Sequence, residues 1–513
     1  MTLLKSAFTV GSMTLISRML GFVRDMIIAS QLGAGMLSDV FFVAFKLPNF
    51  FRQLFAEGAF NAAFVPLYSS ILTEKGEDYA KDFADKVAAA LTFCLLITTV
   101  LAQIFMPWVM YALAPGFGGS PEKFDLAVLL TRITFPYLIF MSLVSLQGGI
   151  LNSVGRFAAA AFTPVVLNLC LIIAALLLSK YTETPAHALA IGVTIAGAAQ
   201  FLWLWIAMKR AGLTITPRMP HLNPEVKMML KRMLPGALGA GVTQLNLWID
   251  TILATLIPSA VSYLYYADRV NQFPLAIIGT AMGTALLPLL SKQIRSGQRD
   301  EALFTQNRAV ETSLLFSLPA AAALVVLSAP IVSVLFQRGE FGVEETLATS
   351  HALTAFALGL PAYVLIKVFA PGFFANGDTK TPVRISIICL LTNTVLNLLF
   401  IKPFGYIGLA MATVIASWLN VFLLSINLTK RDIFHADERL KKRLPRIILA
   451  SLVMAVVLWG TTHYAAPYFE ARSVIRMMAL SVLIGIGLAV FFGTAHLLKA
   501  CNLKKILKLH KGI

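Results

Sequence analysis

Residues 8–28 read FTVGSMTLISRMLGFVRDMII, a stretch that is apolar and long enough to cross a bilayer yet contains Arg18, Arg24 and Asp25. Arg52 and Arg269 lie in two further apolar stretches. A guanidinium at the centre of a bilayer costs about 3 kcal/mol on insertion scales, so each of these side chains must face water or an anion. The pattern predicts an anion-handling cavity inside a membrane protein.

The composition indicates a polytopic membrane protein. Of the 513 residues, 58% are hydrophobic and 13% are charged, whereas soluble domains are about 25% charged. The first apolar run is interrupted by Ser17 and Arg18 and precedes no small-residue cleavage site, so we expect it to remain as a span rather than be removed as a signal peptide. The net charge of +17 is concentrated in short loops, which favours a topology signal over a nucleic-acid partner.

Apolar runs of about 20 residues predict an all-α fold with about 14 transmembrane helices. The predicted spans are 6–31, 36–70, 85–112, 125–152, 158–180, 186–208, 229–257, 261–291, 307–336, 346–374, 381–401, 405–429, 445–466 and 473–498. Lysine and arginine gather in the loops 209–232 and 430–446, which the positive-inside rule places in the cytoplasm. Because the number of spans is even, we expect both termini on that side.

An internal repeat divides the predicted spans into lobes. A shift of 222 residues aligns residues 59–67, AFNAAFVPL, with residues 281–289, AMGTALLPL, and weaker matches follow in order at nearly the same offset. Six spans separate the copies, so the two six-helix lobes share one orientation, as in parallel-repeat transporters. The predicted domains are an N-terminal lobe at 1–215, a C-terminal lobe at 222–430, an extra helix pair at 440–500 and a basic cytoplasmic tail at 501–513.

The first span has two polar faces. Arg18 and Asp25 are seven residues apart and share one face of the helix, whereas Ser17 and Arg24 share another. One interpretation is that Arg18 and Asp25 pair with each other as an interior staple, since intramembrane charges often pair. The other is that these side chains line the wall of a substrate cavity.

The second span adds an acidic and basic stripe. Asp39, Lys46 and Glu57 are spaced so that they lie on one side of a straight helix, with Arg52 well off that stripe. Since guanidiniums outnumber the available acids, the set favours an anionic ligand, and bidentate donors fit phosphate better than an ammonium does. Arg269 opens the corresponding helix of the second lobe, so we expect the arginines to converge on one cavity.

A second group of polar side chains lies in later spans. Asp250 is deep in the seventh predicted span, Asn393 and Asn397 share one face of the eleventh, and Thr413 lies in the twelfth. One carboxylate with neutral oxygens is a donor set for a hard cation, and sodium is the natural candidate in a transporter. The alternative is hydrogen bonding between helices, which is common for Asn and Thr in membranes.

Several motifs resemble one known family. They are SRMLGFVRD at 17–25, FFVAFKLPN at 41–49, FAEGAF at 55–60, YYADR at 265–269 and KVFAPGF at 367–373. The chain closely resembles the MurJ (MviN) lipid II flippases of the MOP exporter superfamily, and the likeness covers essentially its whole length. The resemblance implies a fourteen-helix protein of the bacterial cytoplasmic membrane. Such proteins move the undecaprenyl-pyrophosphate-linked peptidoglycan precursor from the inner to the outer leaflet by alternating access.

The resemblance also implies roles for particular residues. The substrate-binding positions that it indicates are Arg18, Arg24, Arg52 and Arg269, with Ser17, Asp25, Asp39 and Glu57 among the neighbouring polar groups. It implies a lipid-tail groove at the last two helices and, in some members, a sodium ion held by residues matching Asp250, Asn393, Asn397 and Thr413. Relatives that place an acid three residues after Arg269 differ from this chain, which has Gln272 there.

Other functions fit the sequence less well. A flippase for another polyprenyl-linked glycan would share the pyrophosphate clamp, and a cation-coupled drug antiporter of the same superfamily would typically have twelve spans and an acidic, aromatic cavity. No nucleophile with its base, Walker loop or metal triad is present, so we predict that the chain is not an enzyme. The expected partners are lipid II, the bilayer and, as a candidate class, peptidoglycan synthases.

Overall fold

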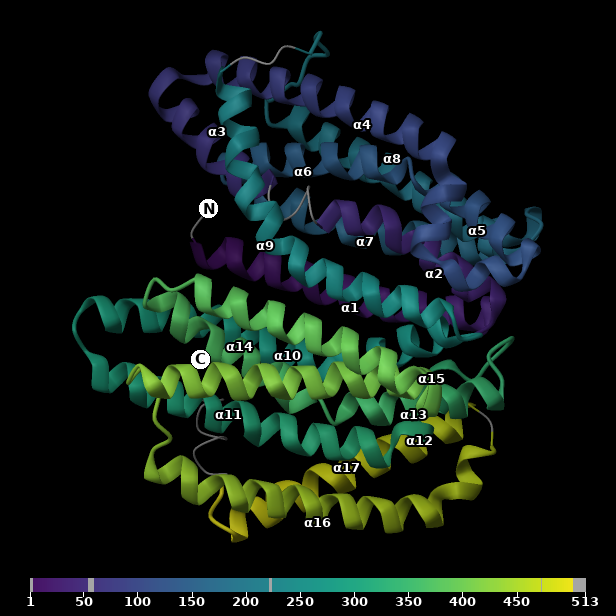
Figure 1. Ribbon diagram of the computed structural model, residues 1–513, viewed down its shortest axis with the longest axis vertical. Coiled ribbons are helices and arrows are strands. Elements are labelled where there is room, and N and C mark those ends of the chain that lie inside the picture. The colour runs from purple at the N-terminus through teal and green to yellow at the C-terminus, as the bar shows by residue number, and fades with distance from the viewer. Residues whose placement is uncertain (1–2, 54–59, 221–223, 472, 502–513) are drawn as a thin grey trace. The chain divides into compact units, whose positions relative to one another are not determined.

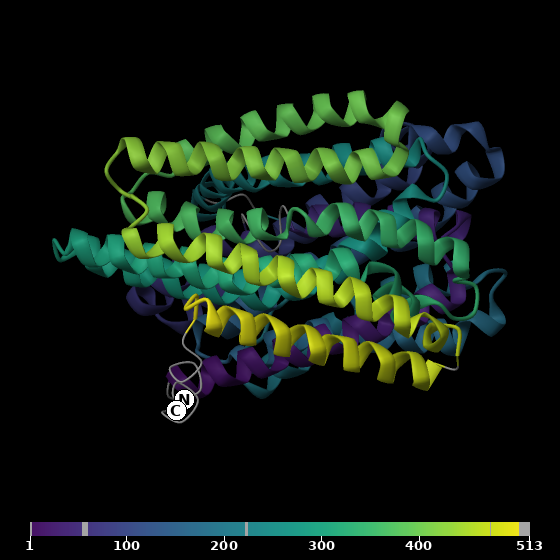
Figure 2. The ribbon, with the colours of Figure 1, turned by 90° about the horizontal axis from the view of Figure 1, so that it is seen from below.

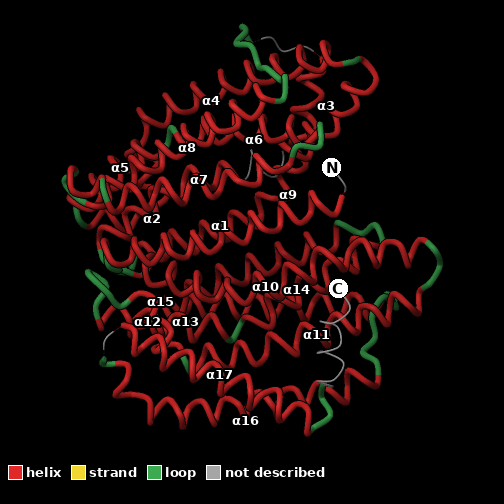
Figure 3. Tube along the Cα trace, turned by 180° about the vertical axis from the view of Figure 1, so that it is seen from behind, coloured by secondary structure: helices red, strands yellow, loops and turns green. Residues whose placement is uncertain are grey.

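The computed structural model describes residues 3–53, 60–220, 224–471 and 473–501. Over these ranges the chain forms helices joined by turns and loops, with no β-strand among them (Figure 3). The all-helical prediction is confirmed. The described residues fall into two compact units, of which unit 1 contains 1–262 and 338–341 and unit 2 contains 263–337 and 342–513.

Unit 1 is built from antiparallel helices that pack side by side (Figure 1). They are α1 (Leu3–Leu32), α2 (Met36–Phe51), α3 (Asn61–Lys75), α4 (Glu77–Leu113), α5 (Pro121–Thr134), α6 (Tyr137–Ser153), α7 (Phe157–Leu176), α8 (Pro185–Arg210) and α9 (Pro224–Thr255), with short 3-10 helices η2 (Pro115–Gly119) and η3 (Leu178–Tyr181). Helix α1 packs on α7, α7 on α8, and α2 on α5. These contacts place the charged faces of α1 and α2 against neighbouring helices of the same unit.

Unit 2 contains the rest of the chain. It comprises most of α10 (Ala260–Arg295), then α11 (Arg299–Val326), α12 (Ser328–Phe336), α13 (Val343–Ala357), α14 (Leu360–Ala375), α15 (Lys380–Lys430), α16 (Glu438–Phe469) and α17 (Ser473–Leu497). The last two helices run side by side, as their yellow-green and yellow ribbons show in Figure 2. They also pack on α11, where Leu458 of α16 and Phe491 of α17 are buried in one apolar core.

The predicted spans correspond to helices, but several are interrupted where a helix cannot continue. Span 125–152 is divided into α5 and α6 at Pro136, which has no backbone N–H to donate into the helix. The predicted division between spans 381–401 and 405–429 corresponds to a break within α15 at Gly405, whose φ of 56° is a left-handed conformation that glycine adopts without strain. Local backbone chemistry therefore accounts for both breaks.

Nine candidate membrane spans are found among the described residues by length and hydropathy. Helices α1, α2, α9 and α10, which carry most of the predicted site residues, are not among them. Helix α2 has 16 residues and is shorter than a helix that spans a bilayer.

The compact units are defined by packing, whereas the predicted lobes 1–215 and 222–430 and the extra pair 440–500 are defined by an internal repeat. Unit 1 extends to Ser262, because α9 packs against α3, α4 and η2. Helices α16 and α17 belong to unit 2, because both pack on α11. The lobes, the extra pair and the internal repeat stay predictions.

Candidate anion site and the buried charges around it

The Arg24 cluster joins α1 to α7. The Arg24 guanidinium donates from Nε and Nη2 to Oδ1 of Asp25, at 2.9 and 2.6 Å, and from Nη1 to Oδ1 of Asn168 on α7, at 3.0 Å. The Asn168 amide in turn donates from Nδ2 to the Ser17 carbonyl oxygen, at 2.9 Å. Ser17 and Arg24, which are about two turns apart on α1, therefore contact the same amide from another helix.

Gly21 makes this approach between helices possible. It lies between Ser17 and Arg24 on the face of α1 that meets α7, and a Cβ there would be 3.5 Å from the Asn168 amide. Small residues at a helix interface let a neighbouring helix come close. The Asn168 amide consequently lies over Gly21, within hydrogen-bonding distance of both the Ser17 carbonyl oxygen and the Arg24 guanidinium.

The first-span prediction was right about one face and wrong about the other. Ser17 and Arg24 were expected on one face, and both contact Asn168. The staple interpretation paired Arg18 with Asp25, but Asp25 accepts from Arg24 instead, because the long Arg24 side chain folds back onto its neighbour. Arg18 is exposed, whereas Arg24 and Asp25 are 6% and 0% exposed.

Asp39, at the start of α2, is a second buried charge. Its carboxylate and the groups that bond it, from Lys123, Ser259 and Ser262, form the Asp39 cluster. Its Oδ1 accepts from the Ser262 backbone N–H at 3.0 Å and the Ser262 hydroxyl at 2.5 Å. Its Oδ2 accepts from the Ser259 backbone N–H at 3.1 Å and from Lys123 Nζ at 2.9 Å. Since Ser259 and Ser262 flank the first residues of α10, the Asp39 carboxylate caps that helix from α2.

Lys123 completes the Asp39 cluster from α5. Its ammonium is 4.3 Å from the centre of the buried Phe117 ring in η2, so its charge is shared between a carboxylate and an aromatic face. The carboxylate pairs with a lysine from a different span because α5 packs on α2.

Lys46 and Arg52, further along α2, contact other groups. The Lys46 ammonium donates to the Leu247 carbonyl oxygen at 3.2 Å and to the Thr251 hydroxyl, which ties α2 to α9. Arg52 donates from Nε to Asn49 Oδ1 at 2.7 Å. Glu57, the third member of the predicted stripe, lies outside the described residues.

Arg269 belongs to unit 2 and is half-buried on α10. Its guanidinium carbon is 5.8 Å from the centre of the Tyr265 ring, one turn earlier. Asp268, beside it, accepts from Gln272 Nε2 at 2.8 Å. Gln272, which stands where some relatives have an acid, is therefore a neutral donor to Asp268.

The predicted sodium ligands are divided between the two units. Asp250 is on α9 of unit 1, and the other three are on α15 of unit 2. Asn393 and Asn397 are buried at 1% and 0% exposure, and the Thr413 hydroxyl donates to the Leu409 carbonyl oxygen. Amide and hydroxyl oxygens are ligands that sodium accepts, so the donor chemistry on α15 fits the prediction.

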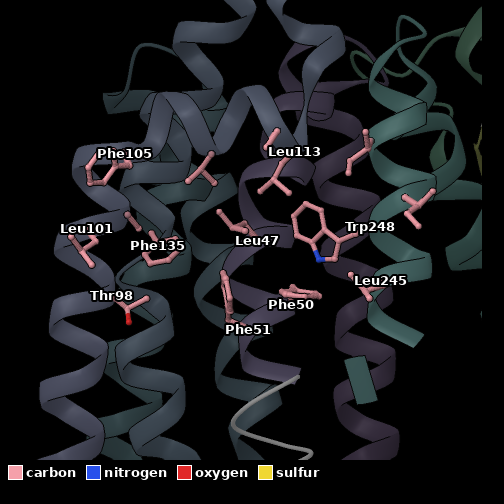
Figure 4. A pocket seen from close by; sticks show the side chains of 15 residues that line it. Leu47, Phe50, Phe51, Thr98, Leu101, Phe105, Leu113, Phe135, Leu245 and Trp248 are labelled. Atoms are coloured by element: carbon pink, nitrogen blue, oxygen red, sulfur yellow. The ribbon is translucent and has the colours of Figure 1, made fainter. Parts of the chain in front are cut away.

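An apolar cavity in unit 1 is separate from these charges. It has a volume of about 610 Å³ and lies between α2, α4 and α9, with Phe50, Phe51 and Trp248 on its walls (Figure 4). None of its lining residues is charged, and Thr98 is its polar exception. Its chemistry suits hydrocarbon rather than a phosphate.

Outside the predicted spans, a loop carboxylate also has a strongly perturbed environment. Asp378 accepts hydrogen bonds from Thr381 and contacts the Arg431 guanidinium, and these contacts hold the pKa of Asp378 well below its usual range. Asp378 precedes α15 and Arg431 follows it. The pair therefore connects the two ends of this long, broken helix.

Asn168 and Lys123 are the site residues that the sequence analysis missed. Asn168 is the single amide in the apolar helix Phe157–Leu176, a position where a polar side chain usually bonds a neighbouring helix. Lys123 is in the first turn of α5, where it is indistinguishable by sequence from a surface lysine. The sequence therefore offered a signal for Asn168, a lone amide in an apolar helix, and none for Lys123.

Comparisons with known proteins identify the family. The family model described as "Lipid II flippase MurJ" matches residues 28–504. A probable lipid II flippase MurJ from Rickettsia prowazekii is 42% identical over 506 residues, covering 98% of this chain and 99% of the relative. The lipid II flippase MurJ of Burkholderia cenocepacia is 34% identical, covering 96% and 97%.

The chain belongs to the lipid II flippase MurJ family. A solved structure described as "Lipid II flippase MurJ, inward closed conformation" matches it with a TM-score of 0.80 and 28% identity, over 95% of this chain and 98% of that one. A MATE transporter of the MOP superfamily shares the fold at a TM-score of 0.65 and 18% identity, covering 85% and 99%. MurJ membership and the apolar helices indicate a multi-pass protein of the bacterial inner membrane and a transporter family.

Proposed function

We propose that the chain transports lipid II from the inner to the outer leaflet of the bacterial cytoplasmic membrane, and that Arg24 is a ligand of its diphosphate. The observation that carries the proposal is a buried guanidinium, held between α1 and α7 by hydrogen bonds to Asp25 and Asn168, in a chain of the MurJ family. A diphosphate crosses hydrocarbon only when donors replace its water. Guanidinium groups supply such donors in a fixed, planar arrangement.

Arg18, Arg52 and Arg269 are proposed as further ligands of the same anion. Arg18 is exposed, and Arg52 donates one hydrogen bond from its Nε to Asn49 Oδ1. Ser17, Asp25 and Glu57 are proposed as neighbouring polar groups. The substrate contact predicted for Asp39 stays a prediction, and its four accepted hydrogen bonds support a structural role at the start of α10.

A leaflet-resolved measurement tests this function. A bacterium depleted of its own flippase is supplied with this chain, and outer-leaflet lipid II is quantified with an impermeant reagent that cleaves or labels it. We expect growth and outer-leaflet lipid II to be restored by the wild-type chain. A polyprenyl-diphosphate carrying a different glycan serves as the control substrate. Transport of that lipid without transport of lipid II would contradict the proposal.

Sodium is proposed as the coupling ion. Asp250, Asn393, Asn397 and Thr413 would hold it through carboxylate, amide and hydroxyl oxygens, and when bound it would supply a positive charge that compensates the carboxylate. Asp250→Ala is expected to abolish sodium binding, measured by isothermal titration with sodium chloride against choline chloride. Unchanged sodium binding in Asp250→Ala would remove this site from consideration.

Two further proposals concern the setting of the protein. We place both termini in the cytoplasm, since the loops 209–232 and 430–446 are rich in lysine and arginine. Peptidoglycan synthases are proposed as partners, because they would consume the lipid II that reaches the outer leaflet. Accessibility of terminal tags to an impermeant reagent tests the first proposal, and crosslinking in cells tests the second.

A further inference from the structure

Asn168 occupies an unusual position between the polar groups of α1. It is 5% exposed and uses both ends of its amide: Nδ2 donates to the Ser17 carbonyl oxygen at 2.9 Å, and Oδ1 accepts from Arg24 Nη1 at 3.0 Å. The two contacts define the orientation of the amide. Rotating it by half a turn would place Nδ2 against the guanidinium, where two donors would meet.

The contact with Arg24 comes from a neutral group. A carboxylate at the same position would also accept from Nη1, but it would add a negative charge beside the guanidinium and compete with an incoming anion. An amide fixes the direction of the guanidinium plane without adding that charge. Leucine, of similar size, would provide neither the acceptor nor the donor.

We propose that Asn168 is a positioning residue for lipid II transport: it holds the Arg24 guanidinium in the orientation that binds the diphosphate and adds no second negative charge to that of Asp25. The inference rests on the proposed function, in which Arg24 is a ligand of the diphosphate. Asn168 itself does not touch the substrate. Its effect passes through Arg24 and requires the gap above Gly21 that lets α7 approach.

Lipid II binding by the purified full-length protein in lipid nanodiscs tests the proposal. The variants are Asn168→Leu, Asn168→Asp, Arg24→Ala and the double variant of Asn168→Leu with Arg24→Ala. We expect Asn168→Leu to weaken lipid II binding about tenfold, and the double variant to bind no more weakly than Arg24→Ala alone. This non-additivity is the readout that a purely structural role would not produce.

Asn168→Asp separates orientation from charge. The new carboxylate can still bond Arg24, so we expect the thermal unfolding midpoint to be retained while lipid II binding weakens at least as much as in Asn168→Leu. The matched control is Gln200→Leu. Gln200 is a buried amide on α8 that donates to the Thr163 carbonyl oxygen of α7, at 2.7 Å, so its loss should lower stability and leave lipid II binding unchanged.

The possible outcomes are distinct. Wild-type affinity in Asn168→Asp, or equal losses from Asn168→Leu with and without Arg24, would overturn the positioning role. Wild-type affinity in Arg24→Ala would overturn it too, since Arg24 would not be a ligand. Failure of the proposed function has a different signature, because the wild-type chain itself would then bind and transport no lipid II.

Discussion

Arg24 and Asp39 are both buried charges in unit 1, yet their surroundings differ. The Arg24 guanidinium meets the adjacent Asp25 carboxylate and a neutral amide. The Asp39 carboxylate accepts four hydrogen bonds, two of them from backbone N–H groups at the start of α10 and one from an ammonium. Equal burial therefore accompanies two different environments: the proposed diphosphate ligand Arg24 has one carboxylate and one neutral amide beside it, whereas Asp39 connects α2 to α5 and to the start of α10.

Replacing Arg24 is the strongest way to break this comparison. Arg24→Ala is expected to lower lipid II affinity about 100-fold, as truncating one member of a buried charge pair typically does, and to abolish rescue of a flippase-depleted bacterium. Arg24→Lys keeps the charge but loses the planar fork, so we expect only partial rescue. Protein level, measured by immunoblot, is the control. Full rescue by the alanine variant would show that the two clusters do not differ in this way.

Replacing Asp39 should instead affect folding. Asp39→Ala leaves Lys123, whose side chain is 14% exposed, without its carboxylate and beside unpaired N–H groups, which we expect to lower the free energy of unfolding by about 3–5 kcal/mol. Thermal unfolding of the purified protein measures the loss, and lipid II affinity of the folded fraction should change far less than in Arg24→Ala. A stable Asp39→Ala protein that has lost lipid II binding would reverse the assignment of the two clusters.

Lys123→Met tests the structural role of the Asp39 cluster and should lower stability less than Asp39→Ala does. Methionine keeps the apolar stem against Phe117 but removes the donor to Asp39, which retains its three other hydrogen bonds. We expect a loss of about 1–3 kcal/mol in unfolding free energy, the usual cost of a hydrogen bond to a charged group. If Lys123→Met destabilised the protein as much as Asp39→Ala, the ion pair rather than the helix cap would dominate.

Asp378 is a carboxylate outside the predicted spans, and we expect its replacement to change stability least. Its pKa is lowered by Thr381 and Arg431, so its stabilising contribution is present above the ordinary carboxyl pKa of about 4 and is lost as pH falls through the lower folded value. Asp378→Asn should therefore reduce the unfolding midpoint modestly at pH 7. The difference between variant and wild type should shrink below about pH 4, as thermal unfolding across pH can show.

The sequence predicted the helices and the charged residues better than it predicted their partners. Hydropathy located the spans, and spacing along α1 brought Ser17 and Arg24 to one face, because helical periodicity is a local property. The partners Asn168 and Lys123 come from helices 144 and 84 residues away from Arg24 and Asp39. Such partners depend on how helices rotate and pack, which local periodicity does not contain.

The helix breaks have a similar explanation. Pro136 interrupts the predicted span 125–152, because hydropathy describes side chains and the interruption arises in the backbone. The division at Gly405 agrees with the predicted spans 381–401 and 405–429. The compact-unit boundary at Ser262 follows from the packing of α9 on α3 and α4. The internal repeat assigned α9 to the predicted second lobe, and a repeat does not report which neighbours a helix contacts.

Because Gly21 has no side chain, the size of the residue at position 21 can set the place of the Asn168 amide, and through it the place of the Arg24 guanidinium. A methyl group there would be in ordinary contact with the Asn168 amide, at 3.5 Å, whereas larger side chains would push the amide away from α1. A series of increasing volume at position 21 would displace the guanidinium by degrees while every charge in the protein stayed constant. Geometry and electrostatics, which substitutions of Arg24 always change together, could then be varied separately.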